Sequence, residues 1–516
     1  MTYEIDAPRA QDDPLRAGEA AALPAQRTSC ADAPAGPAAA PGPSGRLGPV
    51  LAAVVPAAVT LAFGLWRIRH RGSMWQDEST TYQVAHRSIS EIWRLLGDAD
   101  AVHGLYYLFM HVWFAVWGGG VLALRMPSAL GMAAAAAGIG LIGHRLAGPW
   151  TGLAAGCAFP MISSVQYYAQ EGRSYALVSA AVVWSTYLLL RAVDRRTWTA
   201  WAGYGAAAAL SCLLHEFAVL SLLAHGVTLL LARVPRGVWW GWICSAGAAC
   251  AVLAPLVVTS QRQSGLVGWI PDPTRGQWED LFVLILTGAV CGLVPVPARG
   301  RIRVRTVALP LLALPPVALL TASYAHPLYL ERYTLYMYAG LALLFGAALE
   351  WMLRTAWDRR LVALGLIAVV FLLHLSEWRH MRTPASRRDN TLATAQAVRD
   401  LARPGDGVVF TPHWRREAML SSPEKFQGLR DVTLQEAPGP SGTLAGVEVP
   451  PARMRPAMLA GKRLILVGDL PWRRKPGNPQ EDAKRKVLRE DFRPCVSRRV
   501  QTIVVVVYVP RHGGRC

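Results

Sequence analysis

Long apolar stretches constrain this chain more than any other feature of its sequence. About eleven of them are long enough to cross about 30 Å of hydrocarbon as helices. A helix satisfies its backbone hydrogen bonds within its own segment, as a bilayer requires of a spanning chain. The sequence therefore predicts a polytopic α-helical membrane protein and excludes a single soluble globule. The predicted spans are residues 48–66, 126–143, 151–168, 175–191, 200–215, 217–232, 238–258, 280–297, 306–322, 333–352 and 361–377.

Composition divides the chain into three parts. Hydrophobic residues make up 53% and charged residues 17%, whereas soluble domains carry about 25% charged residues. Residues 1–46 are rich in Ala, Pro and Gly and predict a disordered cytoplasmic tail. Residues 47–378 hold the spans. Residues 379–516 change composition sharply, with a helix-like stretch followed by strand-like ones, and predict a small α/β domain. The helix-like stretch is 391–403, and the strand-like ones are 407–410, 463–467 and 502–509.

The distribution of arginine predicts the orientation in the plasma membrane. With the N-terminus cytoplasmic, the inner loops hold 13 arginines and the short outer loops hold 4, in line with the positive-inside rule. The first outer loop, about 67–125, holds six arginines, but long loops count less in this rule. An odd number of spans places the C-terminal domain outside, where Cys495 and Cys516 could pair. The net charge of +19 comes without a nucleic-acid-binding signature, so we expect no nucleic-acid partner.

Two shorter stretches lie in the first outer loop. Residues 105–118 are apolar, carry two tyrosines and two tryptophans, and are too short to span. Aromatic side chains of this kind favour the headgroup boundary. We expect this stretch, and residues 88–96, to form interfacial helices that lie in the membrane surface.

Polar motifs at the ends of the predicted spans are the functional candidates, because ionisable groups at a membrane boundary are costly. Asp77-Glu78 could supply a general base and a metal or hydroxyl contact, or could be a solvated loop turn. Arg173 could neutralise a lipid-linked phosphate while Glu171 orients a sugar, or the two could pair within a polar turn. Arg332 is a second candidate for a phosphate clamp, or an interfacial anchor.

Two histidines add a possible metal site. His215-Glu216 interrupts an apolar run of more than 30 residues. The pair could complete a divalent metal site with His103 or Glu78. Alternatively, His215 and Glu216 bond each other at a tight hairpin, and His103 is a helix-start residue.

The predicted topology places all of these motifs at the outer face. A lipid-phosphate-sugar transferase needs such a cluster, because a base must deprotonate the acceptor and cations must stabilise the departing phosphate. A transporter or flippase of lipid-linked sugars is the alternative, and a non-catalytic scaffold is a third. Transporters favour broken helices near the midplane and paired halves, whereas here the polar groups gather at one face.

The ordered motifs resemble those of GT-C membrane glycosyltransferases. Within that class they resemble the clan of protein O-mannosyltransferases and lipid A aminoarabinose transferases, actinobacterial mannosyltransferases included. The matching motifs, which cover about 48–378, are Asp77-Glu78 after the first helix, His103–Tyr107 for a His-Pro-Pro-Leu-Tyr-Tyr stretch, Leu124–Ser128 for Leu-Arg-Leu-Pro-Ser, Gln170–Tyr175 for Gln-Glu-Ala-Arg-x-Tyr, and Arg332-Tyr333 for the late Arg-Tyr. This chain lacks the prolines after His103 and has Leu-His-Glu at His215 where relatives have Thr-His-Tyr.

The resemblance implies an inverting transfer from a polyprenyl-phosphate sugar at the outer face. The sugar could be mannose, and the acceptor a cell-envelope glycan, lipid or protein. A divalent metal, seen in some relatives, would be optional. The residues implied are Asp77 and Glu78 for catalysis; Arg173, Arg332 and Tyr333 for the donor phosphate; Glu171, Tyr175 and Tyr107 for the sugar or acceptor; and His103, His215 and Glu216 for the metal.

Overall fold

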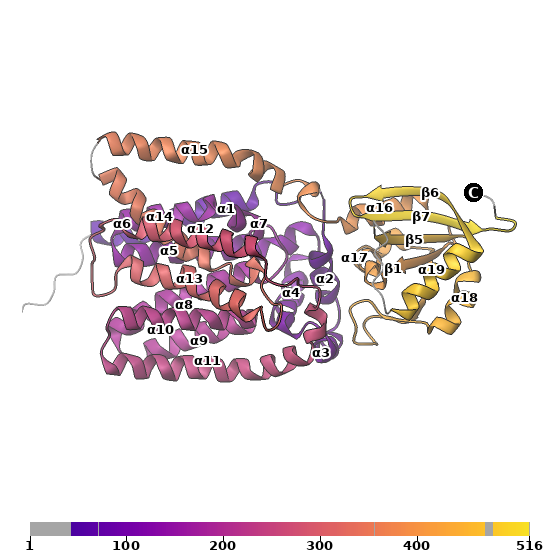
Figure 1. Ribbon diagram of the computed structural model, residues 1–516, viewed down its shortest axis with the longest axis horizontal. Helices are drawn as coiled ribbons and strands as arrows, with labels where there is room; N and C mark the ends of the chain where they lie inside the picture. The colour runs from indigo at the N-terminus through magenta and orange to yellow at the C-terminus, as the bar shows by residue number, and fades with distance from the viewer. Residues whose placement is uncertain (1–42, 71, 355–356, 470–477, 515) are drawn as a thin grey trace, which may run out of the picture. The chain divides into compact units, whose positions relative to one another are not determined.

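The computed structural model in Figure 1 describes residues 43–70, 72–354, 357–469, 478–514 and 516. The chain divides into two units, Met1–Gly45 and Arg46–Cys516. Apart from residues 43–45 at the start of the first helix, the described residues belong to the second unit. Most of the predicted tail, residues 1–42, lies outside the described residues. The first helix begins at Pro43, a few residues before the predicted end of that tail.

Each predicted span contains a helix, and seven of the described helices are long and apolar enough to cross a membrane. These seven are α1 (Pro43–Leu65), α5 (Val121–Leu146), α8 (Tyr175–Arg195), α11 (Arg236–Arg262), α13 (Val304–Ala322), α14 (Met337–Arg354) and α15 (Trp357–Met381). The remaining four predicted spans hold shorter or more polar helices: α6 (Pro149–Ala158) with α7 (Ser163–Tyr168), α9 (Trp198–Leu214), α10 (Leu220–Leu231) and α12 (Arg275–Gly292).

The prediction of one continuous span over 151–168 is wrong. Helix α6 ends at Ala158, a 3-10 turn covers Phe159–Met161, and α7 follows. Pro160 explains the break, because proline cannot donate the backbone hydrogen bond that a continuing helix needs. Figure 1 shows α5, α6, α8 and α14 running alongside one another in the bundle. Gly140 of α5 faces the backbone of Ala52 in α1, and Gly152 of α6 faces the backbone of α5. A side chain would not fit at either position, so α5 can pack closely on both neighbours.

Four short helices connect α1 to α5. They are α2 (Gln76–Ala85), α3 (Ile89–Asp98), the 3-10 turn η1 (Ala101–His103) and α4 (Gly104–Trp117). Helices α3 and α4 confirm the helical predictions for 88–96 and 105–118. Helix α2 was not predicted, because its sequence is polar and has no apolar periodicity. It carries both carboxylates of the Asp77-Glu78 motif.

The C-terminal region is an α/β domain, as predicted. Its five-stranded sheet has the order β2-β1-β5-β7-β6, with β1 parallel to β2 and β5, and β7 antiparallel to β5 and β6. The predicted strands are β1 (Gly407–Thr411), β5 (Leu464–Asp469) and β7 (Ile503–Pro510). The sequence missed the edge strands β2 (Arg430–Asp431) and β6 (Phe492–Val500) and the hairpin pair β3 (Leu434–Glu436) and β4 (Val447–Glu448). It also missed the helices α17 (Glu417–Ser421), α18 (Pro451–Leu459) and α19 (Pro479–Asp491).

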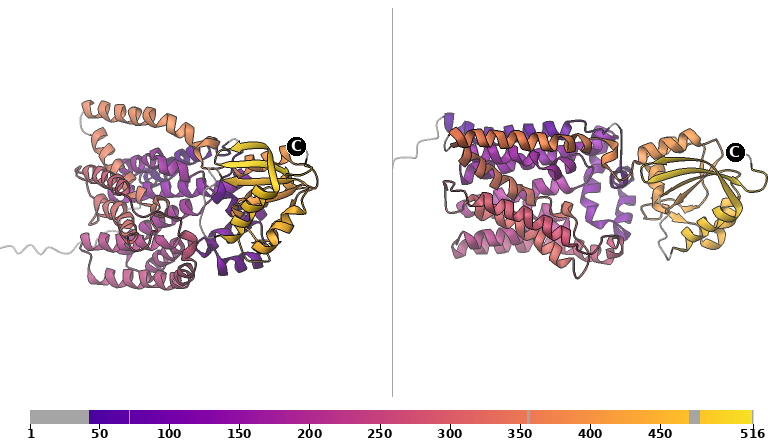
Figure 2. Two further views of the ribbon diagram at one scale, coloured as in Figure 1. Left: turned by 45° about the vertical axis from the view of Figure 1, so that its right-hand side comes forward. Right: turned by 45° about the horizontal axis from the view of Figure 1, so that its top comes forward.

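Helices cover both faces of this sheet (Figure 2). Successive side chains of β1 face opposite ways: Val408 packs with α16 (Thr391–Leu401), and Val409 packs with α18 (Pro451–Leu459) and α19 (Pro479–Asp491). The valine-rich sequence of β7 fits this burial on both sides.

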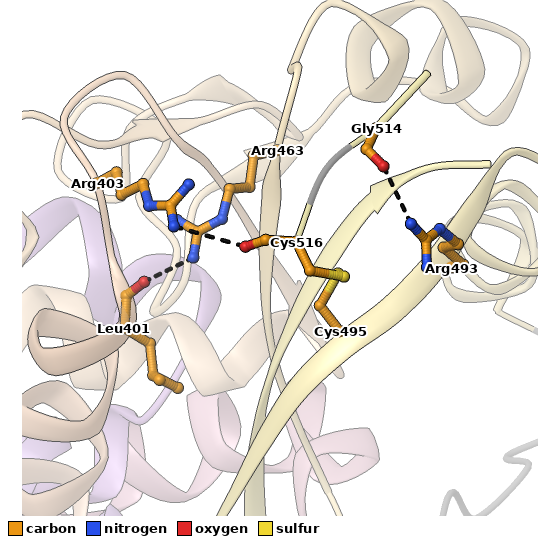
Figure 3. Close-up of a disulfide and its surroundings, with 7 residues drawn as sticks. All are labelled: Leu401, Arg403, Arg463, Arg493, Cys495, Gly514 and Cys516. Carbon is orange, nitrogen blue, oxygen red and sulfur yellow. Dashed lines mark hydrogen bonds between the residues drawn. A yellow bond between two sulfur atoms is a disulfide. The ribbon is translucent and has the colours of Figure 1, made fainter. Parts of the chain in front are cut away.

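A disulfide joins Cys495 of β6 to Cys516, with the two Cα atoms 5.7 Å apart (Figure 3). The chain end is also held by hydrogen bonds, from Arg493 Nη2 to the Gly514 carbonyl at 3.0 Å and from Arg403 Nη2 to the Cys516 carbonyl at 3.5 Å. The pairing that the sequence left open is therefore present.

Candidate functional site

Asp77 lies in the first turn of α2 between two guanidinium groups. Its Oδ2 atom is 3.2 Å from Arg332 Nη1 and 4.0 Å from Arg173 Nε. The side chain of Asp77 is 22% exposed, against 15% for Arg332 and 8% for Arg173. The three residues come from segments more than 90 residues apart, and the fold brings them together as the sequence predicted.

Both arginines have an N–H donor without an acceptor among the described residues. In the described part of the chain, the Nε atoms of Arg173 and Arg332 are buried and have no hydrogen-bond partner. Buried donors of this kind are normally satisfied. Two guanidinium groups against one partly exposed carboxylate therefore form a cationic site with free donors, which suits an anion such as a phosphate.

Each arginine is also held by aromatic side chains. Arg173 Nη1 donates to Tyr107 Oη at 3.1 Å, and Tyr107 in turn donates to Asp100 at 2.5 Å. The predicted sugar contact Tyr107 is thus buried and fixes Arg173. The Arg332 guanidinium lies 5.5 to 5.9 Å from the ring centres of three aromatic residues, Tyr175, Trp269 and Tyr333. Trp269 was not singled out by the sequence, because it stands in a loop between α11 and α12 without a polar motif.

Tyr175 and Tyr333 belong to an aromatic cluster beside Arg332. His215 lies 4.6 Å from Tyr333, 5.8 Å from Tyr175 and 5.9 Å from His103, measured between ring centres. Burial, together with the nearby Arg173 charge, lowers the pKa of His103 well below its usual range. His103 is therefore neutral at pH 7, and its buried Nδ1 atom has no hydrogen-bond partner among the described residues.

The predicted metal ligands come together only in part. His103 and His215 are neighbours, whereas Glu216 accepts a hydrogen bond from Ser260 Oγ at 2.6 Å. Among the described residues, no group of three or more His, Cys, Asp or Glu side chains is arranged to hold a metal ion. His103, His215 and Glu216 therefore do not form the predicted metal site, and the mechanism proposed for this chain uses no metal ion.

Glu78 faces away from this site, although it follows Asp77 directly. It is fully buried, and both of its oxygens accept hydrogen bonds from Arg125 at 2.6 Å. Gly172 N donates to Glu78 Oε1 at 3.0 Å. Arg125 also donates to the carbonyls of Ile68 and Ser73, so the pair fixes the chain that enters α2. Glu78 therefore has a structural role: together with Arg125 it holds α2 in place.

Glu171 also forms a buried ion pair, with Arg387. Its Oε2 atom accepts a hydrogen bond from Arg387 Nη1 at 2.8 Å, and both side chains are 1% exposed. The Arg387 guanidinium stacks 3.6 Å from the ring centre of Tyr167. Arg387 stands in the segment that leads from α15 into the α/β domain, and its partner lies more than 200 residues earlier.

The same segment, residues 382–391, anchors α2. Asp389 accepts hydrogen bonds from Gln76 N at 2.9 Å and from Arg415 Nη1 at 2.8 Å. The backbone N–H of Thr391 donates to the Met74 carbonyl at 2.8 Å. The residues before and within the first turn of α2, where Asp77 stands, are therefore tied to the start of the α/β domain. Sequence reasoning missed these contacts, because nothing in the composition of 382–391 marks its partners.

Replacing Asp389 by alanine should loosen this segment. Two hydrogen bonds to the Asp389 carboxylate are lost, and a hydrogen bond to a charged group is worth about 1.5–3 kcal/mol. Because about 1.4 kcal/mol is a factor of ten in population and proteolysis follows the open population, trypsin should cleave at Arg387 or Arg388 at least about tenfold faster. Asp400→Ala, which removes an exposed aspartate of the same domain paired with Arg498, is the control. Equal cleavage of Asp389→Ala and wild type would contradict the anchoring role.

No protein-family model matches the chain, and no curated protein sequence matches it. Solved structures match its fold. ArnT from Cupriavidus metallidurans bound to undecaprenyl phosphate superposes with a TM-score of 0.52 at 14% identity, covering 89% of this chain and 97% of that one. The apo state of the same protein gives 0.51 at 13% identity, covering 88% and 97%. AglB, an archaeal oligosaccharyltransferase from Archaeoglobus fulgidus, gives 0.45 at 10% identity, covering 82% and 69%.

The likeness to ArnT is one of fold, and it extends over nearly the whole of both chains. It confirms the predicted fold class: a GT-C-like bundle of membrane helices followed by a small α/β domain.

Proposed function

We propose that this chain is an integral-membrane glycosyltransferase that uses a polyprenyl-phosphate sugar as donor. The observation that carries the proposal is Asp77, partly exposed between Arg173 and Arg332. The Nε atoms of both arginines have no hydrogen-bond partner among the described residues. A fold shared with a protein that was crystallised with undecaprenyl phosphate supports it. The finer assignments proposed here are mannose as the sugar, a cell-envelope glycan, lipid or protein as the acceptor, and the outer face of the plasma membrane as the location.

The arginines suit the charge that develops during transfer. A polyprenyl-phosphate sugar is a phosphodiester with one negative charge. When the bond from C1 of the sugar to the phosphate oxygen breaks, the lipid phosphate gains a second negative charge. Two fixed guanidinium groups stabilise this leaving group more than they stabilise the substrate, and only such a difference accelerates the reaction.

Asp77 is the general base of the proposed transfer. The phosphate competes with Asp77 for the two guanidinium groups, which leaves the carboxylate free to accept a proton. Asp77 then takes the proton of the acceptor hydroxyl as the hydroxyl oxygen bonds to C1 on the side opposite the phosphate. The configuration at C1 inverts, and the products are the glycosylated acceptor and polyprenyl phosphate. Tyr175, Tyr333 and His215 would line the sugar, because rings and neutral polar groups suit its alternating apolar and hydroxyl faces.

Membranes from cells that express the protein test this function. Radiolabelled polyprenyl-phosphate mannose is supplied, and label is followed into envelope material. We expect wild type to incorporate label and Arg332→Gln to incorporate about 10²-fold less, since one charge on the leaving phosphate is then unmatched. Arg275→Gln is the matched control, because Arg275 is 92% exposed and pairs only with Glu279 in the described structure.

Three outcomes would contradict parts of the proposal. Equal label in wild type and Arg332→Gln would remove Arg332 from the donor site. Transfer from another polyprenyl-phosphate sugar, but not from the mannose donor, would overturn mannose alone. Movement of the intact donor between leaflets, without transfer from any donor, would favour a flippase.

A further inference from the structure

A second group of arginines lies at the opposite end of the helix bundle from α2, the helix that carries Asp77 and Glu78. Helix α5 contains Arg125, which contacts Glu78, and twenty residues later Arg145. At 1.5 Å per residue these positions are about 30 Å apart, which is the thickness of the hydrocarbon core. The two groups of arginines therefore stand at opposite boundaries of the membrane.

The far group surrounds a cavity of about 460 Å³. The ends of α5 and α8, the loop between α10 and α11, and the loop between α12 and α13 form its walls. Four arginines line it, against a single acidic side chain, Asp194, which leaves a net charge of +3. The four arginines are Arg145, Arg196, Arg299 and Arg301.

Among the described residues, only one of these four arginines forms a salt bridge: Arg145 pairs with Asp194. Arg299 lies within electrostatic range of Glu350, a carboxylate that pairs with Arg354. Arg301 Nη1 donates to the Arg233 carbonyl at 3.2 Å, which fixes it without cancelling its charge. Arg196 and Arg299 form no salt bridge with any described residue. The positive-inside rule explains why arginines occur at this boundary, but loop arginines need not converge on one cavity.

The backbone around Arg299 is fixed. Its N–H donates to the Leu146 carbonyl at 3.0 Å, which ties the α12–α13 loop to the end of α5. Gly148, with a φ of 137°, lies close by, and a Cβ at that position would stand 3.2 Å from Arg299 Nη2. A glycine there lets the guanidinium lie against the chain.

The remaining lining of the cavity is mainly apolar. Leu146, Leu190, Val193, Val234 and Ile302 lie beside the arginines. A second cavity of about 310 Å³ shares Leu146 and adds Arg303 and Arg305. Charge next to apolar surface at a membrane boundary matches an amphiphile whose head is anionic. A free anion would gain nothing from the apolar side chains.

We propose that this cavity binds the phosphate of an anionic phospholipid headgroup, in the leaflet opposite the Asp77 site. Arg196 and Arg299 bind the phosphate oxygens, and the apolar lining receives the start of the acyl chains. The basic loops on this side of the bundle raise the local concentration of anionic lipid. This site is independent of the proposed sugar transfer.

Binding of fluorescent phosphatidylglycerol to the purified full chain in a neutral detergent tests the proposal. We expect the double variant Arg196→Gln/Arg299→Gln to bind at least tenfold more weakly than wild type. Fluorescent phosphatidylcholine should bind weakly to both. The double variant Arg262→Gln/Arg275→Gln removes two exposed arginines elsewhere in the bundle and should bind phosphatidylglycerol like wild type. Arg196→Lys/Arg299→Lys keeps the charge and should fall between wild type and the glutamine variant.

Each other outcome overturns the proposal. Equal phosphatidylglycerol binding by wild type and the glutamine variant would remove the arginines from the site. Equal binding of the two lipids would remove the anionic preference. If 10 mM inorganic phosphate displaced the lipid completely from wild type, the cavity would be a site for free phosphate and not for lipid. Gel filtration of each variant confirms that it is folded, and sugar transfer plays no part in the readout.

Discussion

Replacing Asp77 by asparagine should abolish sugar transfer while leaving the protein folded. Asparagine has nearly the same shape but cannot accept the proton of the acceptor hydroxyl at neutral pH. A positioned general base contributes about 10²–10⁴-fold, so we expect kcat to fall by about 10³-fold. Asp77 is partly exposed, and its two close partners are arginines that would themselves bind the donor. We therefore expect the variant to fold.

The KM for the donor separates this role from a binding role. In the variant, Arg173 and Arg332 no longer share their charge with a carboxylate, so the donor phosphate meets no competing anion. We expect an unchanged or lower KM for the donor together with the lower kcat. A raised KM with an unchanged kcat would instead show that Asp77 contributes only uniform binding.

The control for Asp77→Asn is Asp272→Asn, which changes an exposed aspartate in the loop between α11 and α12. It should transfer sugar like wild type, at an equal amount of folded protein. If Asp77→Asn also transferred sugar like wild type, Asp77 would not be the base, and the placement of the active site would fail.

Asp77, Arg173 and Arg332 illustrate what could be predicted from the sequence. Each follows or precedes a strongly apolar segment, so hydropathy and arginine counts place the three at one boundary. The strands β1, β5 and β7 were predictable for a similar reason: their β-branched, apolar runs are bounded by turn residues. In both cases the signal is local and repeated over several residues.

Glu78 illustrates what could not be predicted. Adjacent residues of a helix point about 100° apart, so one can face a site while the next faces the core. This distinction requires knowing that α2 is a helix, and its polar sequence gives no periodic signal. The helix packs against α4 and against α17 of the α/β domain. The partners of Arg387 and Asp389 could not be predicted either, because single contacts between distant segments leave no local sequence pattern.

The buried pair of Glu78 and Arg125 should matter for folding, unlike Asp77. Both side chains are 0% exposed. Removing one partner of such a pair leaves an uncompensated buried charge, which costs about 3–5 kcal/mol. We therefore expect Glu78→Gln and Arg125→Gln each to lose most of the folded protein recovered in mild detergent. Fluorescence-detected gel filtration over a temperature series measures this loss.

The double variant Glu78→Gln/Arg125→Gln should be less destabilised than the sum of the single variants, because neither buried charge then remains. Glu279→Gln, which breaks the exposed pair with Arg275, should change stability by less than about 1 kcal/mol. Additive losses in the double variant would show that Glu78 and Arg125 act separately.

Acidity should weaken the same pair. Burial acts to raise the pKa of Glu78, but the Arg125 guanidinium outweighs it and holds the pKa below its usual value. A folded-state pKa below the unfolded one means that the stabilisation is fully present above the unfolded pKa. It is lost as the pH falls through the folded value. The difference in melting temperature between wild type and Glu78→Gln should therefore shrink as the pH is lowered below the usual pKa of a glutamate. A difference that stayed constant over this range would contradict the ionised pair.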